Sequence, residues 1–132
     1  MKKVVMLAAL GLVAATGASF AADAANGEKV FAKCKACHMV GEGAANRVGP
    51  QLNGIAGRKA GAVADFKGYG PDLKKMGDEG LVWTAEKLSA YLKDPKAFNP
   101  TTKMAFAGVK DETELADVVA YISAFGEDGK KK

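Results

Sequence analysis

Glycines gather in one long stretch near the middle of the chain. Ten of the 16 glycines in this 132-residue sequence lie between Gly41 and Gly80, where few apolar residues recur at helical spacing. Glycine loses more conformational freedom on folding than any other residue, so such a stretch favours loops. A long irregular segment in a compact domain usually serves a site. We therefore expect loops with one or two short helical turns here, and a core completed by something other than side chains.

Two helices flank this stretch. The first is expected over residues 26–35, where Asn26 is a suitable N-cap and apolar residues follow at helical spacing. The second begins after Thr84 and is ended by Pro95. From Pro95 to Gly108 the sequence predicts a loop.

The last helix carries the clearest pattern. Asp111 and Glu114 form a capping pair three residues apart. Apolar residues then follow on one face, namely Leu115, Val118, Val119, Ile122 and Phe125. Gly126 is a natural stop, and we expect residues 130–132 to be a disordered, charged tail. Because no alternating strand pattern exceeds a few residues, the predicted fold class is all-α with loops.

One short motif carries specific chemistry. Residues 34–38 read Cys34-Lys35-Ala36-Cys37-His38, which is the attachment signature of a c-type haem. Two residues between the cysteines set their sulfurs at the separation of the two haem vinyl groups, so that each forms a thioether. The next residue, His38, then lies beneath the iron as an axial ligand. One covalently bound haem c is therefore the predicted cofactor.

Three other interpretations of the motif are weaker. A thioredoxin-like redox pair needs a βαβ context, which the sequence lacks. A disulfide across two intervening residues would close a small loop and stabilise the fold little. A metal site built from side chains alone lacks ligands, because the chain has two cysteines and one histidine.

The sixth iron ligand decides the function. Met1 and Met6 belong to the N-terminal leader described below, and Met39 adjoins the motif histidine and does not reach the opposite haem face. Met104, on a loop braced by proline, is the preferred candidate, Met76 is the first alternative, and a lysine is the less favoured one. Ligation by histidine and methionine raises the haem potential and leaves no open iron position. This favours electron transfer and argues against an enzyme.

The N-terminus has the three parts of a secretory signal peptide. Two lysines precede an apolar run over residues 4–15, and small residues follow as far as Ala22. We place the cleavage after Ala21, so that residues 1–21 are the leader and residues 22–132 form a single domain. The alternative is an uncleaved membrane anchor, because the run approaches the ~20 residues needed to span a bilayer.

The charge balance argues against nucleic acid as a partner. The whole chain has 19 basic and 15 acidic residues, a net charge of +4, and removal of Lys2 and Lys3 leaves 17 minus 15, or +2. No block of basic residues is mixed with aromatic residues.

These features together resemble a class I c-type cytochrome, most closely the cytochrome c2 group, which is similar to mitochondrial cytochrome c. The matching positions run through the whole mature chain: Gly27, Phe31, Cys34 to His38, Val48 to Gly54, Gly57, Arg58, Phe66, Tyr69, Gly80 to Trp83, Leu88, Tyr91, Leu92, Asp94 to Lys96, Pro100, Thr102 to Met104, Phe106, Gly108, Ala120 and Tyr121. The resemblance implies a monomer with the cytochrome c fold, in which the N- and C-terminal helices cross and loops wrap around the haem.

The resemblance also implies roles for single residues. The Pro50 carbonyl would accept the second ring N–H of the motif histidine, and Tyr91 would lie near the Met104 sulfur. Arg58, Tyr69, Trp83 and Thr102 would donate to the haem propionates. Gly27 would let the terminal helices approach closely. The chain departs from the family at Thr101, where glycine is frequent, and in a longer stretch between Tyr69 and Trp83.

Partners follow from the same resemblance. Basic residues match a ring around the exposed haem edge, namely Lys33, Arg47, Lys96, Lys103 and Lys110. We expect an electron carrier in the periplasm that moves single electrons from a membrane cytochrome bc complex to a photosynthetic reaction centre, a respiratory oxidase or a denitrification enzyme. The alternatives are a membrane-tethered cytochrome, and a haem peroxidase or sensor with a labile sixth ligand.

Overall fold

The computed structural model describes residues 21–132. The expected leader, residues 1–21, lies outside the described residues except for Ala21. Between Ala21 and Lys132, no helix combines the length and the apolar character that crossing a bilayer requires.

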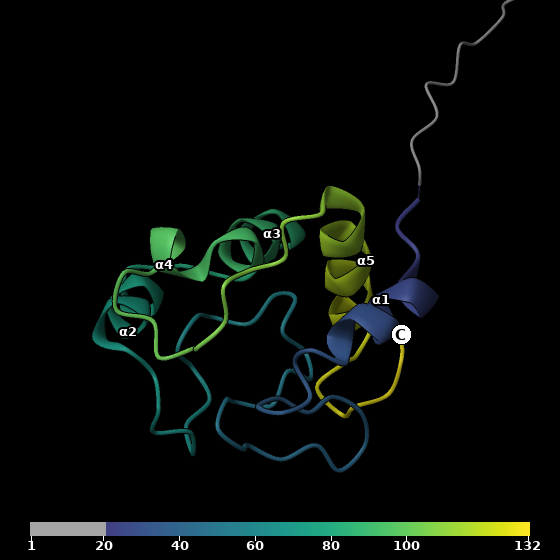
Figure 1. Ribbon diagram of the computed structural model, residues 1–132. Helices are drawn as coiled ribbons and strands as arrows, with labels where there is room; N and C mark the ends of the chain where they lie inside the picture. The colour runs from purple at the N-terminus through teal and green to yellow at the C-terminus, as the bar shows by residue number, and fades with distance from the viewer. Residues whose placement is uncertain (1–20) are drawn as a thin grey trace, which may run out of the picture.

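Helices and loops make up the described chain, as predicted (Figure 1). In chain order the helices are α1 (Ala24–Phe31), α2 (Pro71–Asp78), α3 (Ala85–Lys93), α4 (Pro95–Phe98) and α5 (Glu112–Ser123). Within residues 21–132, β structure is confined to two isolated bridges, which join Lys59 to Val82 and Phe125 to Lys131.

The first helix begins earlier than predicted. Its N-cap is Asp23, whose carboxylate accepts hydrogen bonds from the backbone N–H groups of Ala25 and Asn26 at 3.0 and 3.2 Å. The predicted cap, Asn26, instead lies in the first turns and donates from its side chain to Asp117 on α5 at 2.8 Å. Helix α1 also ends at Phe31, four residues before the predicted end at Lys35, because the attachment motif continues as tight turns.

The other helix starts follow their local signals more closely. Thr84 caps α3 and Asp111 caps α5, as predicted, through side-chain acceptors for Lys87 and Glu114 N–H at 3.2 and 2.9 Å. The prediction of a loop from Pro95 to Gly108 is wrong at the start of this range, where the short helix α4 lies. Proline ends the preceding helix, yet its fixed φ also suits the first position of a new one.

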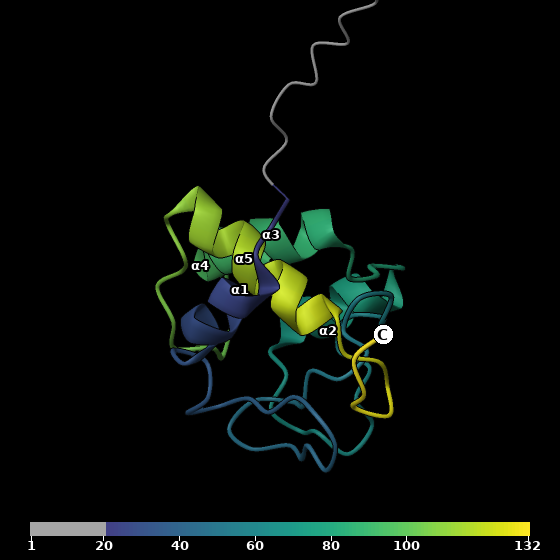
Figure 2. The same cartoon turned by 90° about the vertical axis from the view of Figure 1, so that its right-hand side faces the viewer.

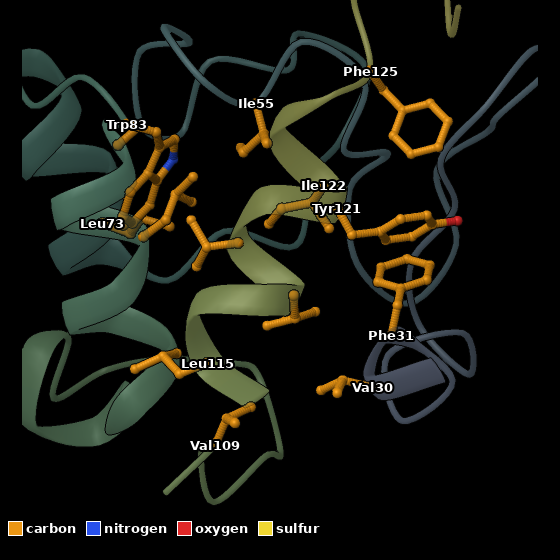
Figure 3. Packing of buried hydrophobic residues seen from close by; sticks show 14 residues of the cluster. Val30, Phe31, Ile55, Leu73, Trp83, Val109, Leu115, Tyr121, Ile122 and Phe125 are labelled. Atoms are coloured by element: carbon orange, nitrogen blue, oxygen red, sulfur yellow. The ribbon is translucent and has the colours of Figure 1, made fainter. Parts of the chain in front are cut away.

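The terminal helices cross at Gly27. A Cβ atom there would lie 2.0 Å from the Asp117 carbonyl oxygen, so only glycine allows this approach of α1 to α5. Figure 2 shows the crossing, and Figure 3 shows the aromatic rings beside it. The Phe31 and Tyr121 ring centroids are 5.4 Å apart, and those of Tyr121 and Phe125 are 5.2 Å apart.

The core surrounds α5. Figure 3 places Ile122 and Leu115 along this helix, with Trp83 on one side and Val30 on the other. A second group of apolar side chains packs against this core but is only partly covered by protein. Its members are Cys34, Val40, Leu52, Tyr69, Leu81, Tyr91, Leu92, Phe98 and Phe106. The core is therefore complete around the helix crossing and incomplete toward the loops.

The C-terminal residues differ from the expected disordered tail. Helix α5 ends at Ser123, and the chain then folds back so that Lys132 N–H donates to the Ala124 carbonyl at 2.8 Å. The Lys131 ammonium lies 5.9 Å and 5.8 Å from the ring centroids of Tyr121 and Phe125. These backbone and cation–π contacts attach a segment whose composition alone suggested a free end.

Replacement of Asp117 should destabilise the helix crossing. This carboxylate is 3% exposed and accepts from Asp23 N–H at 2.7 Å and from the Asn26 side chain at 2.8 Å. Asp117→Ala removes the acceptor of both donors, so the free energy of unfolding should fall by about 2 to 3 kcal/mol in denaturant titrations. The matched control is Glu112→Ala on the same helix, whose side chain is 86% exposed in its pair with Lys93 and should cost less than about 1 kcal/mol. Equal losses would contradict this prediction.

Candidate haem and iron site

The attachment motif forms turns directly after α1. Cys34 N–H donates to the Phe31 carbonyl at 2.7 Å, and the N–H groups of Cys37 and His38 both donate to the Cys34 carbonyl, at 3.1 and 2.9 Å. Both thiols are free, so the structure does not contain the alternative disulfide. Burial raises the pKa of the Cys34 thiol, the charge of Cys37 adds to this, and Lys33 opposes it. The two cysteines therefore stand on one compact turn.

The motif histidine is oriented by the backbone. Its Nδ1 atom lies 2.7 Å from the Pro50 carbonyl oxygen, which only accepts hydrogen bonds, so Nδ1 carries the proton. Burial lowers the pKa of His38, the Pro50 carbonyl opposes this shift, and the Arg58 charge adds to it. The imidazole is thus neutral near pH 7, with the lone pair on Nε2, which is the form that binds a metal.

Gly49 closes the site behind the imidazole. A Cβ atom at this position would lie 2.4 Å from His38 Cε1 and 2.8 Å from both ring nitrogens. The Gly49 N–H donates to the Cys37 carbonyl at 2.9 Å, which fixes this backbone against the motif. Sequence reasoning included Gly49 in the family match but gave it no role, because its contact with the ring comes from the folded loop.

Met104 lies on the loop after α4, where its backbone N–H joins a small network of the Thr102 and Tyr91 hydroxyl groups. Its N–H donates to the Thr102 hydroxyl oxygen at 3.2 Å, and the Tyr91 and Thr102 hydroxyl oxygens are 2.9 Å apart. Burial raises the pKa of Tyr91, and hydrogen bonds to Thr102 and Asn99 oppose this shift. If Tyr91 donates to Thr102, the Thr102 hydroxyl proton is left for another acceptor. The alternative ligand, Met76, lies half-buried on α2.

The three other predicted propionate partners lie in neighbouring segments. Arg58 and Trp83 are joined by a backbone hydrogen bond of 2.8 Å, from Trp83 N–H to the Arg58 carbonyl. The Arg58 guanidinium donates to the Gln51 carbonyl at 2.8 Å and to the Asn53 carbonyl, and burial lowers its pKa. The Tyr69 hydroxyl accepts from Val63 N–H at 3.2 Å and keeps its own proton to donate.

The indole of Trp83 is buried among aromatic rings, and Trp83 is 5% exposed. The ring packs with Tyr91 and Phe98 at centroid distances of 5.4 and 5.8 Å. Phe98 was missed by the sequence analysis, which placed it in a featureless loop.

The residues present fit a haem. Partly covered apolar side chains provide a surface for a flat apolar group, and donors at Tyr69, Trp83 and Thr102 suit its carboxylates. Across residues 21–132, no group of three His, Cys, Asp or Glu side chains is placed to hold a metal ion. The donor set of one imidazole and one thioether accordingly suits an iron that arrives within a porphyrin.

Comparisons with known proteins agree with this geometry. A family model described as Cytochrome c matches residues 24–125. The chain is 51% identical over 105 residues to a cytochrome c2 of Afifella marina, covering 80% of this chain and 84% of the relative. It is 49% identical over 121 residues to a cytochrome c2 of Blastochloris viridis, covering 92% of each. A solved cytochrome c2 structure from Rhodospirillum centenum superposes with a TM-score of 0.74 at 43% identity, covering 79% of this chain and 98% of that chain.

The chain therefore belongs to the cytochrome c family. Within this family it is a class I c-type cytochrome of the cytochrome c2 group, with the all-α fold of its structural relatives. It carries one covalently attached haem c with its iron. The predicted family, fold class and cofactor are thereby confirmed.

Replacement of Gly49 should displace the imidazole. In Gly49→Ala the new methyl group overlaps the ring, so His38 loses its geometry toward the Pro50 carbonyl. We expect a loss of about 1 to 3 kcal/mol in stability, together with a shifted His38 Nδ1 proton resonance in NMR spectra. The adjacent Val48→Ala, at a side chain that is 75% exposed, should change stability by less than about 0.5 kcal/mol and leave that resonance in place. An unshifted resonance in Gly49→Ala would contradict the prediction.

Proposed function

We propose that this protein is a soluble periplasmic electron carrier whose haem is attached through Cys34 and Cys37 and whose iron is ligated by His38 and Met104. The observation that carries the proposal is the hydrogen bond of 2.7 Å between His38 Nδ1 and the Pro50 carbonyl. It leaves Nε2 as the coordinating atom directly after two free thiols on one turn. Haem iron supplies the redox chemistry, because it cycles between ferrous and ferric states by single electrons.

The surrounding side chains would keep this centre closed and its charges satisfied. The Pro50 carbonyl fixes the imidazole and makes it a better donor. Arg58, Tyr69, Trp83 and Thr102 would donate to the propionates, and the Tyr69 hydroxyl, which accepts from Val63 N–H, keeps its own proton for this. With both axial positions filled by protein, no position is left for a substrate, which supports a carrier over an enzyme.

The same proposal extends to location and partners. The N-terminal sequence has the pattern of a cleaved export signal, and the relatives named cytochrome c2 support an exported carrier. Electrons would pass from a membrane cytochrome bc complex to a reaction centre, a terminal oxidase or a denitrification enzyme, with the carrier acting as a monomer.

The basic residues proposed for docking differ in how free they are. Lys33 pairs with Glu114 at 3.8 Å, Arg47 donates to the Lys35 carbonyl at 3.4 Å, and Lys110 donates to the Lys93 carbonyl at 2.7 Å. Lys96 and Lys103 are exposed. All five can turn toward an acidic partner, because each lies at the surface.

Removal of the Met104 thioether tests the iron ligation. In Met104→Ala the ferric protein should completely lose the weak absorption band at the red end of the visible spectrum, which reports a methionine–iron bond. The ferrous protein should then bind carbon monoxide, because one axial position is open.

The control for this experiment is Met76→Ala, which removes the alternative ligand. It should keep the ferric band and exclude carbon monoxide, because Met76 lies on α2 and would not be coordinated. The reverse result, with the band lost only in Met76→Ala, would transfer the ligand assignment to Met76.

Charge reversal at two lysines tests the docking face. Lys33→Glu with Lys96→Glu should slow electron uptake from the membrane cytochrome bc complex by on the order of tenfold at low salt, and flatten the salt dependence of the rate. The matched control is Lys67→Glu with Lys74→Glu, which changes net charge equally at two lysines that line a cavity of about 370 Å³ between the 59–67 loop and α2. If both double variants respond alike, net charge and not a docking face sets the rate.

A further inference from the structure

The chain after α5 forms a closed turn. Gly126 N–H donates to the Lys130 carbonyl at 2.9 Å, Gly129 N–H donates to the Gly126 carbonyl at 3.0 Å, and the Phe125–Lys131 bridge closes the two arms. We call residues 124–132 the C-terminal clasp. The cytochrome c family match ends at residue 125, so most of the clasp lies outside the part of the chain that defines the family.

The clasp packs on the loop that follows the motif histidine. The Phe125 carbonyl accepts from Gly54 N–H at 3.0 Å. At Gly129, whose φ is +81°, a Cβ atom would lie 2.3 Å from the Gly41 carbonyl oxygen. The two backbones are therefore in direct contact, and Gly129 is buried. Figures 1 and 2 both show the yellow C-terminal segment beside the blue loop.

This loop, residues 39–54, is also the one that orients the imidazole; we call it the histidine-side loop. Asn53, which is 7% exposed, closes it with two hydrogen bonds of 2.8 Å, one to the N–H and one to the carbonyl of Gly41. Pro50 lies between these ends and holds His38 Nδ1. Gly41 is thus held by Asn53 from within the loop and by Gly129 from outside it.

We propose that the C-terminal clasp positions the His38 imidazole by holding the histidine-side loop closed at Gly41 and Gly54. Within residues 21–132, the backbone hydrogen bonds of the clasp end on this loop, on α5 or within the clasp itself, and none reaches the imidazole or the thiols. The clasp therefore acts through the loop. The inference rests on the proposed ligation by His38. When the clasp opens, the loop loses its outer support, and the hydrogen bond to the Pro50 carbonyl breaks more often.

The test is hydrogen exchange in the haem-loaded mature protein, measured by NMR. Gly129→Val adds a side chain where the backbone of Gly41 lies. Exchange of the Gly41 and Gly54 amides and of the His38 Nδ1 proton should accelerate at least about tenfold, because exchange reports local opening. The Leu88 amide of α3, which donates to the Thr84 carbonyl, should accelerate less than about threefold. If Gly129→Val does not fold, Gly129→Ala replaces it.

The matched control is Gly43→Val on the same loop. Gly43 has a φ of +76°, close to that of Gly129, but nothing lies within 4 Å of a Cβ atom there. The two substitutions thus share the backbone strain and differ in the contact with the clasp. Gly43→Val should leave exchange of the His38 Nδ1 proton within about twofold of the starting protein.

Three results would overturn the proposal: unchanged exchange in the Gly129 variant, equal acceleration at Leu88, or equal acceleration in Gly43→Val. A separate measurement on the unsubstituted protein tests whether His38 is an iron ligand at all. Before any substitution, the ferric protein should show His38 ring protons strongly shifted by the iron. Unshifted ring protons would refute His38 as an iron ligand. The proposed effect of the clasp on the imidazole would then also be refuted, irrespective of the exchange rates of the Gly41 and Gly54 amides.

Discussion

One hydrogen bond, from His38 Nδ1 to the Pro50 carbonyl, decides how the centre of this protein is arranged. It leaves Nε2 as the ring nitrogen that is free to bind a metal. It also requires the chain to turn back to the motif at Pro50, a dozen residues after His38. The bare backbone of Gly49 packs against the ring for the same reason. Residues 41–54 have no regular elements of their own, and they are ordered by contacts with the His38 and Arg58 side chains, with each other and with the C-terminal clasp.

The helices provide the fully buried apolar core that the loops lack. The core at the α1–α5 crossing is built from close backbone approach at Gly27 and from aromatic rings packed at tilted and edge-on angles, and it is complete without help from the loops. Toward the loops the apolar side chains are only partly covered. A cytochrome c closes this side with its porphyrin, which explains how a chain with so many glycines still folds around a full core.

Local signals predicted what depends on local chemistry. The capping residues Thr84 and Asp111 act on neighbours in the sequence, and the structure confirms both. The first helix began two residues before its predicted cap because Asp23 caps it through Ala25 and Asn26 N–H, whereas the contact of the Asn26 side chain with a carboxylate 91 positions away is one that no local pattern reveals. The contacts of the C-terminal residues could not be predicted from local sequence either, since Gly129 packs on the distant backbone of Gly41.

The crossing of α1 and α5 also sets an order of events. The two cysteines proposed for attachment follow α1 directly, whereas the partner of α1 is the last helix of the chain. Contacts between segments so distant in sequence close slowly, because the intervening chain must first give up its freedom. Until α5 docks, α1 lacks the helix that it packs against, so the segment of the two cysteines is expected to be more open than in the folded chain. Docking of α5 onto α1 then completes the fold, so this chain topology allows haem attachment to precede the final packing of the helices.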